Sequence, residues 1–371
     1  MICQDSFTAY EKEDDALLDL FFRTHRYSTQ EYLNQLLEKC WSMSPLNTMR
    51  TIFYLRDCRG GKGEKRLFIN LCQWLWEYHP LELKKCFPLI PHYGSFKDLK
   101  KLLHWQEDLT DHLIPFWCQV LTEDFVSKDI TFAAKYVPIQ DSRFCKELGL
   151  THKEFRFMIR DLRDRLQDVD QPMANKEVGH LKSIVFHPHK RTWRKYLSPW
   201  KKTKKICVVM DSTCSFEEAS LSVALSELSS DYHRQILTFE GQDFLYPKWI
   251  RVNGQTIHQN IKHVSETHGE RFMITPKMIS FLPQDITLVV ITNMSWEKVV
   301  LSSESYDRRI MIWNIAEKNI DVCPSIVSNV TLVKGLHDVF IDLMMETGHF
   351  NGKSVFERMM HSSRYQPIQM D

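Results

Sequence analysis

The feature that most constrains the fold is a short apolar run in residues 205–215, which read Lys-Ile-Cys-Val-Val-Met-Asp-Ser-Thr-Cys-Ser. An apolar run bounded by charge is typical of a buried parallel strand. Ligands of parallel sheets gather beyond the carboxyl ends of strands, and here Asp211, Thr213 and Ser215 follow the run. The segment therefore predicts the start of an α/β domain with a candidate metal site at the end of its first strand.

The rest of the second half alternates predicted strands and helices. A helical pattern over 216–232 precedes strands at 235–239, 285–292, 309–314 and 330–335, and an amphipathic helix follows at 336–347. This alternation favours a mostly parallel, doubly wound sheet of the Rossmann-like kind.

The first half repeats the 3.6-residue period of amphipathic helices. Apolar helical faces lie at 17–22, 29–43, 46–55 and 67–75, with breaks at Gly60-Gly61 and His79-Pro80. Ser44-Pro45 predicts a helix start, and Ser95–Asp98 and Thr151–Glu154 predict capping boxes. Short connections between many helices favour a solenoid-like, HEAT-like array, although no repeat of fixed period is visible. We predict a helical domain over 1–180, a basic linker over 181–204 and an α/β domain over 205–371.

Composition adds few constraints. The chain has 371 residues, with 48 basic and 47 acidic residues, so its net charge favours no polyanionic or membrane partner. No signal peptide or membrane-length apolar run is visible, and the ten cysteines form no metal-ligand pattern. We expect a soluble cytoplasmic protein with reduced, mostly buried thiols.

Local charge is concentrated between the halves. Residues 182–205 carry nine Lys or Arg residues and no acid, with Phe186, Trp193, Tyr196 and Trp200 among them. We name this segment the basic strip. Basic side chains neutralise phosphates and aromatic rings stack on unpaired bases, so the strip suits single-stranded RNA. The alternative is a solvated linker whose aromatics pack on a neighbouring domain. The candidate RNA contacts in the strip are Lys190, Arg191, Arg194 and Lys195.

A second basic cluster, residues 55–66, reads Leu-Arg-Asp-Cys-Arg-Gly-Gly-Lys-Gly-Glu-Lys-Arg, and we name it the arginine–glycine segment. Glycines let successive amides form an anion-binding nest, and phosphate is the obvious anion. The spacing of a nucleotide-binding P-loop is absent. The alternative is a tight turn between helices whose charges pair internally. Its candidate anion contacts are Arg56, Arg59, Lys62, Lys65 and Arg66.

The arginine–glycine segment, together with Pro91–Leu99, Ala134–Pro138, Ile291–Met294, Ile312–Asn314 and Leu332–Gly335, resembles a TROVE-like family. That uncharacterised family, of eukaryotes and large DNA viruses, joins a helical-repeat region to a C-terminal von Willebrand factor A-type domain. Its organisation is similar to that of the Ro RNA-binding autoantigen. The resemblance implies a helical array that binds RNA or a protein, joined to an A-type domain, and it implies no catalysis.

The resemblance also implies a metal-ion-dependent adhesion site, but the sequence departs from it. Asp211, Thr213 and Ser215 fill the first loop, whereas Asn293 stands where the family more often has Asp, and no second-loop threonine is evident. Mg²⁺ usually needs carboxylate ligands, so we expect this site to be degenerate and any Mg²⁺ binding to be weak. The alternative is that these hydroxyls cap the following helix.

Catalytic motifs are not evident. The histidines form no His-Glu-x-x-His pattern, and no Gly-x-Ser-x-Gly elbow occurs. The favoured function is a non-enzymatic RNA-binding scaffold without a small-molecule cofactor or membrane partner. The alternatives are a protein-interaction module using the A-type domain and, with less support, a hydrolase or nucleotide-dependent enzyme.

Overall fold

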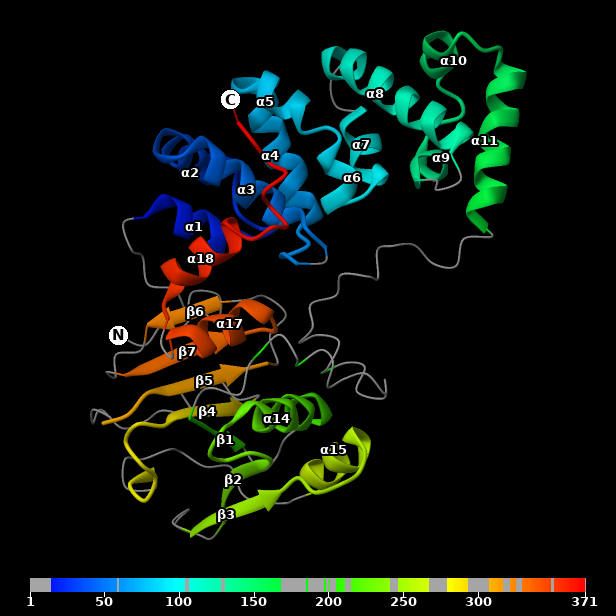
Figure 1. The fold of residues 1–371 in the computed structure, drawn as a ribbon. Coiled ribbons are helices and arrows are strands. Elements are labelled where there is room, and N and C mark those ends of the chain that lie inside the picture. The colour runs from blue at the N-terminus through cyan, green and yellow to red at the C-terminus, as the bar shows by residue number, and fades with distance from the viewer. Residues whose placement is uncertain are drawn as a thin grey trace. The chain divides into compact units, whose positions relative to one another are not determined.

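A computed structural model describes most of the chain in two units (Figure 1). The described residues are 15–58, 60–103, 107–127, 131–167, 205–210, 215–240, 246–266, 279–292, 307–315, 321–324, 329–347 and 350–370, with Val185, Leu197 and Trp200. The helical unit consists of Asp19–Glu177 and Met360–Asp371, and the α/β unit of Met1–Leu18 and Val178–Met359. The predicted combination of an N-terminal helical region and a C-terminal α/β region is confirmed.

The helical region is built from short helices that pack on their neighbours. Contacts join α2 to α3, α3 to α4, α7 to α8 and α10 to α11. The helices are α1 (Ala16–Arg23), α2 (Gln30–Met43), α3 (Pro45–Arg56), α4 (Lys65–Tyr78), α5 (Pro80–Lys85), α6 (Leu89–Tyr93), α7 (Phe96–Leu103), α8 (Glu107–Val126), α9 (Ala133–Tyr136), α10 (Ser142–Leu148) and α11 (His152–Gln167).

Local sequence signals set several helix boundaries. The Ser44 hydroxyl accepts the Asn47 amide at 3.3 Å, and Pro45 occupies the first helical position. The predicted capping box at α11 is present, because Glu154 accepts the Thr151 amide at 2.8 Å and Thr151 accepts the Glu154 amide at 3.3 Å. Gly149 ends α10 with φ of +65°, a conformation that favours glycine.

The α/β unit contains a seven-stranded sheet with the order β3-β2-β1-β4-β5-β7-β6. The run β2, β1, β4, β5, β7 is parallel, and β3 and β6 join it antiparallel at the two ends. The strands are β1 (Ile206–Met210), β2 (Gln235–Glu240), β3 (Tyr246–Arg251), β4 (Thr287–Thr292), β5 (Ile310–Asn314), β6 (Asp321–Pro324) and β7 (Val330–Lys334). The unit's helices are α14 (Phe216–Leu228), α15 (Ile257–Ser265), α17 (Asp338–Thr347) and α18 (Gly352–Met360), whose last residue groups with the helical unit.

Both faces of the sheet are covered. Helix α14 packs on β1, β2 and β4 and also contacts α15 (Figure 1). Alternate residues of the strands, including Val209, Leu288 and Ile312, form a second apolar cluster with Ile279, Leu282 and Ile286. The strand β1 is therefore buried along its whole length, as its apolar sequence predicts.

The structure adds elements that the sequence pattern does not indicate. In the α/β unit, strands β3 and β6 and helices α15 and α18 were not expected, whereas β1, β2, β4, β5 and β7 were. Both missed strands contain proline, Pro247 in β3 and Pro324 in β6. Proline weakens a strand pattern but is tolerated at sheet edges. The predicted C-terminal domain ran to residue 371, but the last residues, Met360–Asp371, group with the helices. Among the described helices, none is long and apolar enough to cross a bilayer.

We predict that Ile312→Ala destabilises the α/β unit by about 2–5 kcal/mol, since it leaves a cavity in a filled core. Ile312 is 0% exposed in β5, between β4 and β7. Denaturant unfolding monitored by circular dichroism checks the loss. Phe281→Ala is the control, because Phe281 is 47% exposed in the same unit. Equal effects of the two substitutions would contradict the assignment of Ile312 to the core.

Candidate nucleic-acid interface

The arginine–glycine segment forms a tight connection between α3 and α4. The Lys62 amide donates to the Tyr54 carbonyl at 3.1 Å, and the Glu64 amide donates to the Leu55 carbonyl at 2.7 Å. These bonds satisfy carbonyls that the end of α3 leaves without helical partners. A Cβ on Gly61 would lie 1.9 Å from the Tyr54 carbonyl oxygen, so only glycine fits there. These amides therefore bind the end of α3 and do not form an open nest for an anion.

Arg56 lies in a buried ion cluster. Its Nε donates to Asp98 Oδ2 at 2.8 Å and its Nη2 lies 2.7 Å from the same oxygen. Lys65 Nζ lies 3.2 Å from the other carboxylate oxygen, and the Ser95 amide donates to Oδ2 at 3.0 Å. Asp98 is 0% exposed and Arg56 is 6% exposed. The charges of Arg56 and Lys65 thus compensate a buried carboxylate.

Asp57 is the centre of a second buried cluster, formed with residues from the end of the chain. Arg364 binds this carboxylate with two nitrogens, and its Nη2 lies 2.7 Å from Oδ1. The Tyr365 hydroxyl donates to Oδ2 at 2.9 Å. The Tyr93 hydroxyl donates to the Arg364 carbonyl, and the rings of Tyr93 and Tyr365 stack with centroids 5.5 Å apart. The C-terminal residues therefore complete the core of the helical unit beside α3 and α6.

The remaining charges of the segment differ in their surroundings. Lys62 Nζ donates to the Phe22 carbonyl at 2.8 Å and to the Thr24 carbonyl at 3.4 Å. Glu64, which is 7% exposed, pairs with Arg26 at 3.1 Å. Arg66 is exposed at the start of α4, and Arg59 lies outside the described residues. Arg56, Lys62 and Lys65 thus have internal partners, which favours the turn alternative for them, and their contact with RNA stays a prediction.

Within the basic strip, the structure describes Val185, Leu197, Trp200 and Lys205. Lys190, Arg191, Arg194 and Lys195 lie outside the described residues. Trp200 is 7% exposed, and its Nε1 donates to Asp342 Oδ1 at 2.7 Å. Burial is the largest cause of the raised pKa of Asp342. Trp200 is therefore part of the α/β unit rather than an exposed ring.

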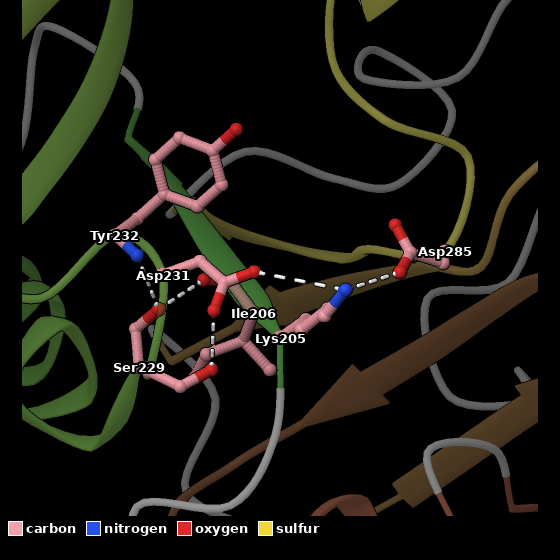
Figure 2. Close-up of polar contacts among 7 residues, drawn as sticks. Lys205, Ile206, Ser229, Asp231, Tyr232 and Asp285 are labelled. Atoms are coloured by element: carbon pink, nitrogen blue, oxygen red, sulfur yellow. Dashed lines mark hydrogen bonds and ion pairs between the residues drawn. The ribbon is translucent and has the colours of Figure 1, made fainter.

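The last lysine of the strip anchors the first strand of the sheet. Lys205 Nζ lies 2.6 Å from Asp285 and 4.0 Å from Asp231, and Figure 2 shows the lysine between the two carboxylates. Beside it, the Ser229 hydroxyl donates to the Ile206 carbonyl at 2.6 Å and accepts the Tyr232 amide at 3.0 Å. Ser229 therefore links the end of α14 to β1, and α14 ends four residues before the predicted boundary, at Leu228.

The candidate metal site follows the ends of two neighbouring strands. Met210, the last residue of β1, pairs with Ile291 of β4, so the chain leaves both strands at one edge of the sheet. Ser215 caps α14: its hydroxyl accepts the Glu218 amide at 3.2 Å, and its own amide donates to Glu218. Asp211, Thr213 and Asn293 lie outside the described residues. The capping alternative thus holds for Ser215, whose hydroxyl already accepts one hydrogen bond.

Exposed cations that the sequence analysis did not single out lie on α7, α9 and α11. Helices α7 and α11 both pack against α9. These cations are Lys97 and Lys101 of α7, Lys135 of α9, and Lys153, Arg156 and Arg160 of α11. Lys135 Nζ lies 5.8 Å from the ring centroids of Phe132 and Tyr136. The sequence signal was present, since Lys153, Arg156 and Arg160 recur at helical spacing, but it was less dense than the basic strip.

The described residues offer little for catalysis. Within those ranges, no group of three or more His, Cys, Asp and Glu side chains is placed to hold a metal. Cys145 Sγ lies 3.5 Å from His152 Nδ1, a pair that sequence spacing did not reveal. Burial raises the pKa of the Cys145 thiol, which disfavours the thiolate that a nucleophile requires.

A cavity of about 780 Å³ lies between β3 and α15. Lys248, Arg251 and His263 line it together with Glu266. Its mixed charge favours neither an anionic nor a cationic ligand.

Comparison with known proteins identifies relatives without a described activity. Residues 4–115 match a family described only as a domain of unknown function, DUF2828. The chain is also 23% identical over 203 residues to the uncharacterized protein L728 of Acanthamoeba polyphaga mimivirus. That similarity covers 46% of this chain and 36% of the viral protein, so the chain spans about a third of this relative's length. No solved structure matches the chain.

The chain resembles an uncharacterised family with a viral relative. The DUF2828 match includes the arginine–glycine segment and the residues 91–99 that contribute Tyr93 and Asp98. The matched region therefore contains both Asp57 and Asp98, the acidic residues of the two buried clusters.

We predict that Arg364→Met destabilises the helical unit by about 3–5 kcal/mol, because it leaves the Asp57 carboxylate buried without its cation. The double variant Asp57→Asn, Arg364→Met should lose less than the sum of the single losses, since the two side chains share one interaction. Thermal and denaturant unfolding of the wild type, the two single variants and the double variant measure this double-mutant cycle. Additive losses would show that the pair is not coupled.

We predict that Tyr365→Phe reduces the loss of stability at high pH. Burial, followed by the charge of Asp57, raises the pKa of Tyr365 well above its usual value of about 10. Above that pH the unfolded chain loses this proton while the native state keeps it, so stability falls as pH rises. Unfolding midpoints between pH 8 and 11 test this, and an unchanged alkaline slope in the variant would contradict it. Loss of the hydroxyl should also lower stability at neutral pH, by about 1–3 kcal/mol.

Proposed function

We propose that the protein is a non-enzymatic scaffold that binds RNA. The observation that carries this proposal is the group of exposed cations on α7, α9 and α11. Within the described part of the chain, Lys97, Lys101, Lys153, Arg156 and Arg160 are exposed and form no ion pair with a carboxylate. Such cations can displace counterions from a phosphate backbone.

The contrast with the arginine–glycine segment supports this assignment. Arg56 and Lys65 already neutralise Asp98, so their release would leave a buried carboxylate uncompensated. No such cost attaches to the cations of α7 and α11. In sequence, α11 also precedes the basic strip, whose Lys190, Arg191, Arg194 and Lys195 are further proposed RNA contacts.

We further propose that the two units correspond to a TROVE-like helical array with HEAT-like repeats and a von Willebrand A-type domain. The strand run β3-β2-β1-β4-β5 supports this, since it follows the order of doubly wound sheets. In that arrangement, Asp211, Thr213, Ser215 and Asn293 would meet where β1 and β4 end. Asp211 would be the one carboxylate there, so weak Mg²⁺ binding is proposed.

A protein-interaction module is the second candidate. Exposed apolar side chains lie on neighbouring helices of the helical unit: Met43 is 53% exposed, Tyr78 48% and Leu81 65%. Trp74 contacts both Tyr78 and His79, so Tyr78 belongs to an aromatic cluster on α4. An exposed apolar group of this kind favours a polypeptide over a phosphate backbone.

We predict that the nuclease-treated protein binds labelled RNA with submicromolar affinity that falls steeply with salt. The variant Lys190→Glu, Arg191→Glu, Arg194→Glu should flatten the plot of log affinity against log salt by about 2, because each lost phosphate contact removes about 0.7 for a single strand. Fluorescence anisotropy across a salt series measures both slopes.

The control variant is Lys39→Glu, Lys262→Glu, Lys353→Glu, which makes the same change in net charge at exposed positions on α2, α15 and α18. It should retain the wild-type slope. Absent or salt-independent binding would remove the RNA proposal. A protein that then co-purifies from nuclease-treated extracts, equally with the wild type and the strip variant, would support the second candidate.

A further inference from the structure

The outer face of α11 combines an exposed aromatic ring with three cations. Phe157 is 69% exposed, although Phe155, Met158, Ile159 and Leu162 on the same helix are buried. Lys153, Phe157 and Arg160 are spaced by four and three residues, so they share one face of the helix. Arg156 lies one turn before Arg160 on the adjoining side. Lys153 and Arg160 therefore flank the apolar ring, and Glu154 and Asp161 lie within one turn of it on the neighbouring sides.

Four of the other charged side chains of α11, Glu154, Asp161, Arg163 and Arg165, have structural partners. Arg163 donates to the Ala134 carbonyl at 2.9 Å, and Arg165 donates to the Phe125 carbonyl at 3.2 Å. The Glu154 carboxylate accepts bonds from Thr151, and Asp161 lies 3.9 Å from Arg165. Asp164, at the C-terminal end of the Phe157 face, forms no ion pair within the described residues. Lys153, Arg156 and Arg160 thus remain available to a ligand.

This arrangement does not benefit the helix itself. Arg156 and Arg160 are like charges at a spacing of four, which destabilises a helix. Phe157 makes no ring contact with another described aromatic residue and gains little from burial. An anionic partner with a flat apolar face would make both features favourable, since it would cover the ring and neutralise the cations.

We propose that the α11 face, formed by Lys153, Arg156, Phe157 and Arg160, binds single-stranded RNA, with Phe157 stacking on an unpaired base. This inference rests on the proposed RNA-binding function and adds its location and strand preference. Stacking requires a base that is not already stacked in a duplex, whereas the cations contact phosphates of either form. The aromatic ring therefore makes this face selective for single strands.

The test compares the wild-type protein with Phe157→Ala, with Phe157→Trp and with a triple variant. The triple variant combines Lys153→Glu, Arg156→Glu and Arg160→Glu. The probes are a labelled uridine-rich 12-mer, the same strand with one 2-aminopurine, and a blunt RNA duplex. Phe157→Ala should weaken binding of the single strand roughly fivefold to a hundredfold and change duplex binding less than about twofold. Phe157→Trp should restore single-strand binding. The 2-aminopurine fluorescence should be quenched by wild type and not by Phe157→Ala. The triple variant should reduce the steepness of the plot of log affinity against log salt by about 2.

Tyr27→Ala is the matched aromatic control, because Tyr27 is 78% exposed in the same unit. Circular dichroism checks that every variant is folded. If wild type binds the single strand and Phe157→Ala binds it with the same affinity as wild type or as Tyr27→Ala, the α11 inference is overturned. The RNA-binding scaffold then still stands. Equal losses for single strand and duplex in Phe157→Ala would also overturn base stacking. If wild type binds no RNA, the proposed function fails as well. Loss of a co-purifying protein in Phe157→Ala, with RNA binding unchanged, would assign the face to a polypeptide instead.

Discussion

The helical unit depends on the buried carboxylate of Asp57. This residue is 0% exposed, and Arg364 and Tyr365 bind it from the other end of the chain. A buried ion pair contributes little compared with an apolar core, but losing one partner is costly. The last residues of the sequence are therefore as much a part of this core as α3, and the unit is completed only by residues more than 300 positions apart in the chain.

The cost of leaving a buried charge unpaired also explains the cluster around Asp98, and it limits which basic residues can bind a ligand. Asp98, also 0% exposed, is compensated by Arg56 and Lys65, and Gly94 lets its carboxylate approach the backbone. A cation next to a buried carboxylate is not free to bind phosphate, because its withdrawal would leave that charge unpaired. In the arginine–glycine segment, the density of basic residues is therefore a poor guide to RNA contacts. Solvent exposure and the lack of a carboxylate partner make the cations of α11 better candidates, although they are fewer.

The α/β unit uses its polar residues in a similar way at its strand ends. Lys205 pairs with Asp285 where β1 begins, Trp200 binds Asp342, and Ser215 caps α14. Each of these residues belonged to a segment that suggested binding, and each has a structural partner. The parallel strands β1 and β4 end at one edge of this sheet through the pairing of Met210 with Ile291, and ligand binding at that edge stays a prediction.

The sequence by itself determined the two kinds of architecture, several helix starts and five of the strands. These features depend on local periodicity and caps, such as Ser44-Pro45 and the Thr151–Glu154 box, which act within a few residues. It did not indicate β3 or β6, because a strand at a sheet edge can tolerate proline and a weak pattern. Only the tertiary structure decided which charges are internal. Asp57 meets Arg364, and Cys145 meets His152, through packing that no sequence spacing encodes. The partner of a buried charge is set by the fold as a whole.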